Sequence, residues 1–396
     1  MKKKHRIELL IPVGAMSKLM TAIEYGADAV YLSGLDYGLR QAADNFNNNQ
    51  LRAASQICQN HKVKLFIVIN SYFHDNDFNK FPEYIKFLNT LKIDALIVSD
   101  LGVIKTLKDL TNIPIHLSTQ ASCLNLHSAK FWKKQGVSRI VLGREVSIID
   151  ASRIKKEISI EVEQFVHGSM CMAFSGQCTI SNFTQGRDSN RGGCAHSCRF
   201  NYSIHNDSTL ISDYFMSSKD LNGIELIPQL IEAEIDSLKV EGRMKTVHYV
   251  STVAKIYREA IDYYYDHGLI KWSQKLKAWT DELNKINHRD YFQGNLLEKK
   301  IQPETYQERE NEKGEMQVVG KVVDVSKENG IILQASHKFN SKDTLEFISF
   351  KGEPIRLELI NMCTVLNEQM EVSKPGQLIK IKYLPNISVN NIIRKI

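Results

Sequence analysis

The feature that most constrains the fold is an alternation of short apolar runs with amphipathic stretches along residues 1–170. Each run has the length and apolar character of a buried strand, and segments with helical spacing lie between several of them. Seven runs fall in this region: Glu8–Val13, Ala29–Ser33, Leu65–Asn70, Ala95–Ser99, Ile115–Ser118, Arg139–Leu142 and Glu161–Val166. An eighth run, Ser237–Val240, follows an interruption and precedes Thr246–His267, the longest amphipathic stretch of the chain.

Near-continuous apolar strands that alternate with helices predict a parallel sheet covered on both faces. Eight such units predict a (β/α)8 barrel, an α/β fold whose chemistry lies on the loops after the strands. A doubly wound open sheet is the alternative that this pattern leaves open. We expect the barrel domain to span residues 1–270.

The rest of the chain predicts a linker and a second domain. Residues 271–315 are polar and charged, which indicates a linker. Residues 316–396 contain short β-rich runs separated by turn signals, which predict a small antiparallel β-barrel. This domain has 11 basic and 8 acidic residues, so it could contact RNA or serve only as a rigid support.

Charge and hydropathy limit the partners. The chain has 51 Lys and Arg against 45 Asp and Glu, and the net charge of +6 permits a polyanionic partner without requiring one. It has no run of 18 apolar residues, so we expect no membrane span. The basic start is followed by the short apolar stretch Ile7–Val13, broken by Glu8 and Pro12, which indicates the first strand of a cytoplasmic protein rather than a signal peptide.

Four of the seven cysteines lie in the interruption, which spans residues 168–221. The spacers between them contain six, fifteen and three residues; the four are Cys171, Cys178, Cys194 and Cys198. Four thiolates suffice to hold an iron–sulfur cluster or a structural zinc ion. Zinc ribbons usually have paired two-residue spacers, which are missing here, so the spacing favours iron–sulfur over zinc, with unligated buried cysteines as the further alternative.

Short motifs accompany these cysteines over about residues 8–300. Within Glu163–Ser181 lie Gly168-Ser169-Met170-Cys171 and Gly176-Gln177-Cys178. Further motifs are Tyr25-Gly26-Ala27-Asp28-Ala29-Val30-Tyr31, Ile115-His116-Leu117-Ser118-Thr119-Gln120-Ala121, Gly143-Arg144-Glu145, Ser218-Lys219-Asp220-Leu221 and Leu238-Lys239-Val240-Glu241-Gly242-Arg243. On these motifs the chain resembles peptidase family U32. Its C-terminal part resembles the extra domain of one branch, the prephenate-dependent tRNA uridine hydroxylases.

The resemblance implies a 4Fe–4S cluster on Cys171, Cys178, Cys194 and Cys198, with prephenate as co-substrate and tRNA as partner. It implies hydroxylation of the anticodon wobble uridine at its 5 position. The alternatives are a 23S rRNA cytidine hydroxylase or another U32-type hydroxylase, a collagenase-like peptidase, and a non-catalytic protein that binds zinc and RNA. His167, Ser169 and Cys171 would be the residues of a peptidase, but their spacing assigns no nucleophile–base arrangement.

Charged residues at the strand ends are candidates for substrate chemistry. Arg144 could capture a carboxylate of prephenate, with an ion pair to Glu145 as the alternative. Lys239, Glu241 and Arg243 alternate along a strand and so share one face, where they could bind substrate or form an internal salt-bridge network.

Other candidates flank the cysteines. His167 could act as a proton donor, or it could be purely structural. Three arginines of the interruption could bind phosphate or prephenate, or could simply be solvated: Arg187, Arg191 and Arg199. We expect the catalytic residues to come from Arg144, Glu145, His167 and Glu241.

Overall fold

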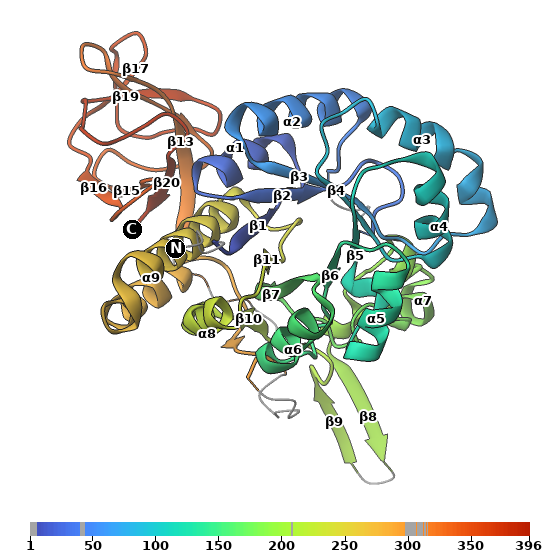
Figure 1. Ribbon diagram of the computed structural model, residues 1–396. Coiled ribbons are helices and arrows are strands. Elements are labelled where there is room, and N and C mark those ends of the chain that lie inside the picture. The colour runs from blue at the N-terminus through green and yellow to red at the C-terminus, as the bar shows by residue number, and fades with distance from the viewer. Residues whose placement is uncertain are drawn as a thin grey trace.

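A computed structural model describes residues 6–39, 44–206, 209–297, 306, 312, 314 and 316–396 (Figure 1). Eight parallel strands form a closed ring in the first domain. They are β1 (Glu8–Pro12), β2 (Ala29–Leu32), β3 (Lys64–Ile69), β4 (Ala95–Val98), β5 (Ile115–Leu117), β6 (Arg139–Val141), β7 (Glu161–Ser169) and β11 (Ser237–Val240). Because β11 pairs in parallel with both β1 and β7, the sheet closes. The predicted barrel is confirmed, and the open sheet is excluded.

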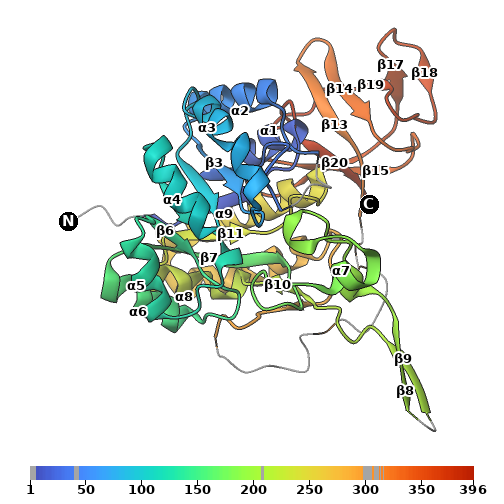
Figure 2. The same cartoon turned by 90° about the vertical axis from the view of Figure 1, so that its right-hand side faces the viewer.

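Helices cover the outside of this barrel (Figures 1 and 2). They are α1 (Met16–Glu24), α2 (Asn48–His61), α3 (Phe81–Leu88), α4 (Leu101–Leu110), α5 (Leu126–Lys134), α6 (Ile148–Ile158), α8 (Ile227–Glu232) and α9 (Val247–Leu283). Side-chain caps define several starts, among them Asn47, Asp100 and Ser147, whose oxygens accept backbone N–H groups of the first turn. None of the helices in the described part of the chain is both long and apolar enough to cross a membrane.

Helix α9 extends further than the sequence predicts. It continues through Leu283, so residues 271–283 of the predicted linker are helical. Gly268 interrupts it with φ 72° and ψ 179°, a conformation that favours glycine, and a second helical arm follows. That arm buries Trp272 and Trp279, and the Trp272 indole N–H donates to the Ala260 carbonyl.

The cysteine-bearing segment lies between β7 and β10 (Asp220–Asn222). It contains α7 (Ile180–Gln185) and a hairpin, β8 (Tyr202–Asn206) and β9 (Thr209–Asp213), which projects away from the barrel (Figure 2). Strand β10 runs antiparallel to β7 and pairs with β12 (Tyr291–Phe292). Short 3-10 helices complete the domain: η1 (Asp75–Asn79), η2 (Thr119–Ala121), η3 (Ser189–Arg191), η4 (Ser197–Arg199) and η5 (Ile224–Leu226).

The C-terminal domain is a curled antiparallel sheet. Its strands are β13 (Gln317–Ser326), β14 (Gly330–Ala335), β15 (Thr344–Ile348), β16 (Ile355–Glu358), β17 (Met362–Thr364), β18 (Gln369–Met370), β19 (Leu378–Ile381) and β20 (Ile392–Lys395). They lie in the order β16-β15-β20-β13-β14-β19-β17-β18 around a separate apolar core that includes Leu333 and Phe347. The antiparallel prediction is confirmed, although within the described residues the end strands β16 and β18 do not pair with each other.

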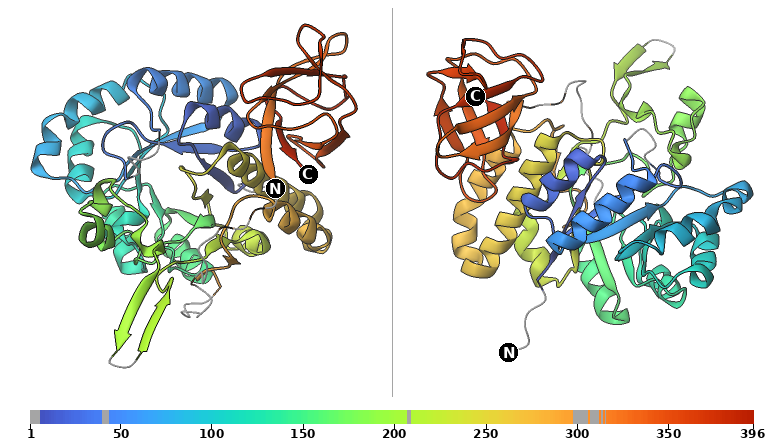
Figure 3. Two further views of the ribbon diagram at one scale, coloured as in Figure 1. Left: turned by 180° about the vertical axis from the view of Figure 1, so that it is seen from behind. Right: turned by 90° about the horizontal axis from the view of Figure 1, so that it is seen from above.

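This domain packs against α1 and α9 (Figure 3). The Tyr25 hydroxyl donates to the Ile348 carbonyl at 2.7 Å and accepts the Ile392 N–H at 3.1 Å. Both isoleucines belong to the same buried cluster as the barrel core. Arg394, fully buried, pairs with Glu346 and, at 2.6 Å, with Glu282 of α9. The two domains are thus joined by apolar packing and by a buried ion-pair network.

Candidate active site

A cavity of about 60 Å³ lies at the carboxyl ends of the barrel strands, with room for a few water molecules. In a barrel of this kind the loops at this end carry the chemistry. The charged lining consists of four residues predicted from the sequence: Arg144, Lys239, Glu241 and Arg243. Aromatic and polar neighbours complete it, among them Tyr31, Asn70, Gln120 and Phe165. The structure therefore brings together candidates from the loop after β6, from β11 and from the loop after β11.

A buried ion-pair network forms the floor of this cavity. Lys239 donates to Glu163 at 2.7 Å, and Arg139 contacts Glu163 at 3.2 Å and Glu8 at 2.5 Å. Burial alone would raise the pKa of Glu163, but Lys239 and Arg139 outweigh it and hold this pKa below its usual range. The Lys239 ammonium also lies 4.2 Å from the centre of the Tyr31 ring. Lys239 is thus committed to an internal network, the alternative that the sequence left open.

The upper part of the cavity carries the remaining charges. The Arg144 guanidinium lies over the Phe165 ring, 4.5 Å from its centre. The Tyr31 hydroxyl donates to the Glu241 carboxylate at 2.9 Å. Burial and the Glu241 charge hold the pKa of Tyr31 well above its usual range, so this hydroxyl remains a proton donor at neutral pH. Arg243 is buried beside them and partly offsets the effect of Glu241.

Glu145 holds the cysteine segment instead of pairing with Arg144. Its carboxylate accepts the Ser175 backbone N–H at 3.0 Å and the Ser175 hydroxyl. Ser175 is fully buried, and its carbonyl accepts the Ser122 hydroxyl at 2.8 Å. A Cβ on the next residue, Gly176, would lie 1.7 Å from the Gln120 side-chain oxygen, so the loop packs tightly against η2. Glu145, which the sequence predicts to be catalytic, therefore anchors the loop between Cys171 and Cys178.

The four predicted ligand cysteines share one neighbourhood. Burial raises the pKa of the Cys198 thiol to about 11, and the thiols of Cys171, Cys194 and Cys178 contribute to this rise. Within the described residues, no three His, Cys, Asp or Glu side chains are close enough to hold a single metal ion. An iron–sulfur cluster places several atoms between its ligands, so its thiolates lie further apart than those of one zinc ion. Four cysteine thiols in one segment are the type of donor that such a cluster takes.

His167 does not face the cavity. The pairing of β11 with β7 shifts at a bulge, where Lys239 is opposite Phe165 but Val240 is opposite His167. The bulge turns His167 away from the cavity and towards α9 and β12, where its ring nitrogens lie 3.2 Å from the Tyr257 hydroxyl and 3.5 Å from the Tyr291 hydroxyl. Burial lowers its pKa to about 3, so it is neutral. This placement agrees with a purely structural role for His167, which the sequence left open as the alternative to a proton donor.

The three arginines of the cysteine segment have different surroundings. Arg187 is exposed. Arg191 forms a two-pronged ion pair with Asp77, at 2.6 and 3.1 Å, which ties the segment to the loop after β3. Arg199 is half-buried, and burial together with nearby Arg289 lowers its pKa. Of these, Arg191 is committed to an internal ion pair.

Sequence reasoning missed the residues that arrange this site. Tyr31, Phe165 and Ser175 lie in the quoted motifs or next to Gly176, yet hydroxyl and aromatic side chains at strand ends carry no distinctive local pattern. Only their convergence at the cavity and under the cysteine segment reveals what they contact.

The comparisons with known proteins identify the family. The profile of Peptidase family U32 matches residues 14–305, and that of the Peptidase family U32 C-terminal domain matches residues 314–394. The chain belongs to peptidase family U32. The two matched regions of this U32 protein correspond to the barrel with its cysteine segment and to the curled sheet.

Three curated relatives of this U32 protein differ in their names. The tRNA hydroxylation protein P1 of Bacillus subtilis is 35% identical, over 98% of this chain and 94% of its own length. An "uncharacterized protease" of Methanocaldococcus jannaschii is 32% identical, over 98% of this chain and 96% of its own length. The 23S rRNA 5-hydroxycytidine C2501 synthase of Escherichia coli is 34% identical, but over only 65% of this chain and 40% of its own length.

Proposed function

We propose that this U32 protein hydroxylates the 5 position of the anticodon wobble uridine of tRNA in a prephenate-dependent reaction. The similarity to the Bacillus subtilis tRNA hydroxylation protein over nearly the whole of both chains carries this proposal. That similarity includes the C-terminal domain, whereas the rRNA relative shares 65% of this chain. A tRNA substrate is therefore favoured over rRNA.

The charges at the barrel mouth suit a dicarboxylate such as prephenate. Arg144 and Arg243 present guanidinium groups at the cavity, and such groups bind carboxylates with two parallel hydrogen bonds. The cavity itself is small, so we place the co-substrate at its rim. Arg144, stacked on Phe165, would then move to meet a carboxylate, while Lys239 stays paired with Glu163 in the floor.

We assign a 4Fe–4S cluster to Cys171, Cys178, Cys194 and Cys198, a cofactor that supplies electron transfer when bound. Glu145 and Ser122 anchor Ser175, so the loop that carries the first two cysteines stays against the mouth. The Tyr31–Glu241 hydrogen bond offers a proton donor and a carboxylate at the same rim. These residues could hold or accept a proton during the reaction, and Glu241 is the candidate base.

Peptidase chemistry has less support from the geometry. In the described structure His167 hydrogen-bonds to tyrosine hydroxyls, and its imidazole contacts neither Ser169 nor Cys171. A nucleophilic mechanism needs a base within reach of the nucleophile.

Mass spectrometry of nucleosides from a strain without the gene tests the proposal. We expect tRNA from this strain to lose nucleosides derived from 5-hydroxyuridine, and the intact gene to restore them. Unchanged tRNA together with loss of 5-hydroxycytidine from 23S rRNA would instead support the rRNA alternative. Colourless, anaerobically purified protein with stoichiometric zinc and no iron would overturn the cluster assignment.

A further inference from the structure

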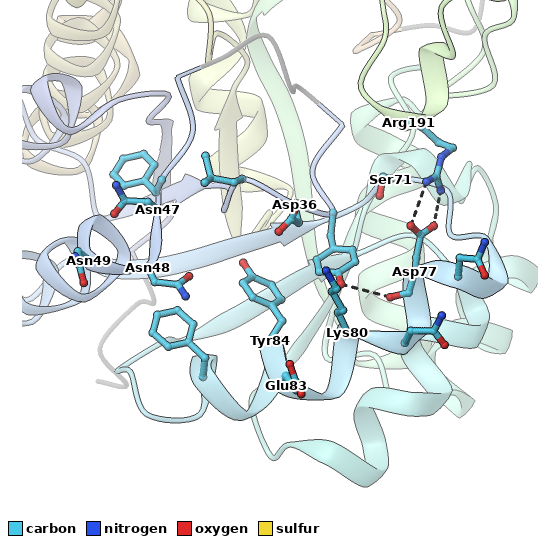
Figure 4. Close-up of a pocket in the computed structure, with 16 residues that line it drawn as sticks. Asp36, Asn47, Asn48, Asn49, Ser71, Asp77, Lys80, Glu83, Tyr84 and Arg191 are labelled. Atoms are coloured by element: carbon cyan, nitrogen blue, oxygen red, sulfur yellow. Dashed lines mark hydrogen bonds and ion pairs between the residues drawn. The ribbon is translucent and has the colours of Figure 1, made fainter.

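A second, larger cavity lies beside the barrel mouth. It is a groove of about 990 Å³ formed by the loop after β2, the start of α2, the loop after β3 with η1, and one face of α3 (Figure 4). Figure 4 shows Asp36, Tyr84 and Lys80 in the middle of the groove. Asn47–Asn49 lie on one side of them, and Asp77 and Arg191 on the other. The residues predicted for catalysis do not line this groove.

The groove is rich in side-chain amides above aromatic rings. Five asparagines line it, from two segments that face each other: Asn47, Asn48 and Asn49 at the start of α2, and Asn76 and Asn79 in η1. Four of these amides form no hydrogen bond within the described part of the chain; only Asn47 does, as the cap of α2. Four aromatic rings contribute the apolar surface: Tyr37, Phe46, Tyr84 and Phe87.

The charges of the groove disfavour an anion. Asp77 is paired with Arg191, which leaves Asp36 and Glu83 against one cation, Lys80. A phosphate or a dicarboxylate would face this excess of negative charge. Carboxylate oxygens do accept hydrogen bonds from the exocyclic amino groups of bases, and asparagine pairs with the amino group and N7 of adenine.

The groove and the mouth share a wall. Asn70 lines the cavity at the mouth, and the next residue, Ser71, lines the groove. The Tyr72 N–H donates to the Asn190 carbonyl at 3.0 Å, and the Asn190 amide donates to the Cys178 carbonyl at 3.0 Å. The cysteine segment, which contributes Arg191 to the groove, is therefore hydrogen-bonded to the loop that separates the groove from the mouth.

We propose that the groove binds an unstacked RNA base with an exocyclic amino group, adjacent to the nucleotide that is modified at the mouth. Unpaired loop bases are recognised by stacking on aromatic side chains and by hydrogen bonds to their edges, and the groove offers both. This inference rests on the proposed RNA substrate. It adds a base-specific contact to recognition that would otherwise depend on backbone charge.

Binding of the full-length protein to an anticodon stem–loop RNA tests this inference. One series of RNAs has a single abasic site at each unpaired loop position around the target uridine. The protein variants are the double substitution Asn48→Ala/Asn79→Ala and the control Asn112→Ala, an exposed asparagine in the loop before β5, at the opposite end of the barrel. All substituted side chains are exposed, so unchanged circular dichroism and melting temperature are expected.

We expect one abasic position to weaken binding to the wild type about fivefold to 100-fold. The double variant should bind the parent RNA more weakly than the wild type does, by a similar factor. On that abasic RNA the double variant and the wild type should have the same affinity. The control variant should match the wild type on both RNAs. Purine riboside, which lacks the amino group, should reproduce part of the loss if the base is adenine.

The inference is overturned if the double variant binds the parent RNA as tightly as the wild type does. It is also overturned if, at every loop position, the affinity loss from the double substitution multiplies the affinity loss from the abasic site, as for two independent contacts. If the wild type still binds the stem–loop specifically in those cases, only the role of the groove is overturned and the proposed tRNA substrate stands. Wild-type protein that does not distinguish the stem–loop from a hairpin with an unrelated loop overturns the groove and the proposed tRNA substrate together.

Discussion

Replacing Arg394 with methionine should lower the free energy of unfolding by about 3 kcal/mol at neutral pH. The Arg394 side chain is 0% exposed and the Glu346 side chain 1%, so the substitution leaves a carboxylate buried with less compensation. Breaking a buried pair in this way costs about 3–5 kcal/mol. Lys285 at 3.6 Å and Arg356 at 3.0 Å remain near Glu346, and methionine preserves the apolar stem, so we expect the lower end of this range.

Urea unfolding monitored by two probes measures this loss. The three tryptophans, Trp132, Trp272 and Trp279, all lie in the barrel domain, so their fluorescence reports that domain, whereas circular dichroism reports both. The matched control is Arg356→Met, because Arg356 also pairs with Glu346 but its side chain is 65% exposed. This control should cost less than about 1 kcal/mol.

The pH dependence gives an independent check. Burial alone would raise the pKa of Glu346, but Arg394 and its other cationic neighbours hold it below the ordinary 4.5. A depressed carboxyl pKa stabilises the fold above the unfolded value, and this contribution is lost as the pH falls through the folded value. The difference in free energy of unfolding between the wild type and Arg394→Met should therefore narrow below about pH 4.5. A free-energy difference that is constant with pH would refute this reasoning. Equal decreases in the free energy of unfolding for the Arg394 and Arg356 variants would also refute it.

Four further predictions concern the proposed site and the domain junction. Alanine at any one ligand cysteine should lower iron content and abolish hydroxylation, whereas Cys58→Ala should only lower stability; equal loss of iron in all variants would indicate folding damage. Glu145→Gln should halve or further reduce the iron content at unchanged melting temperature, because it weakens the anchor of Ser175, and full iron occupancy would contradict this. Arg144→Lys should raise the KM for prephenate about tenfold or more while leaving RNA binding unchanged, as checked by kinetics and filter binding. A chain that ends at Asn311 should be poorly soluble, since Ile348 and its neighbours complete the barrel core, and a soluble, monodisperse product in sedimentation would argue against this.

The barrel strands could be predicted because their signal is local. A strand buried on both faces is apolar along most of its length, whichever strands flank it. All eight predicted runs overlap observed strands, and Lys239, Glu241 and Arg243 line one cavity as their alternation indicates. Helix α9 was predicted too short, because its second arm depends on Gly268 and on packing of Trp272 against the first arm.

The side-chain roles required the tertiary structure. His167 follows the alternation of β7 in the sequence, but a bulge in its pairing with β11 turns it towards α9. Arg144 and Glu145 are adjacent in the sequence, yet one stacks on Phe165 and the other binds Ser175 from a distant loop.

Short segments were enough to predict the eight parallel strands, the antiparallel second domain and the four cysteines as a candidate ligand set, because periodicity and residue type are local properties. The folded arrangement shows which charges face the mouth, which form internal ion pairs, and that an amide-lined groove lies next to the mouth. Those outcomes depend on distances between residues far apart along the chain. Such distances are set by barrel closure and loop packing, and local patterns do not encode them.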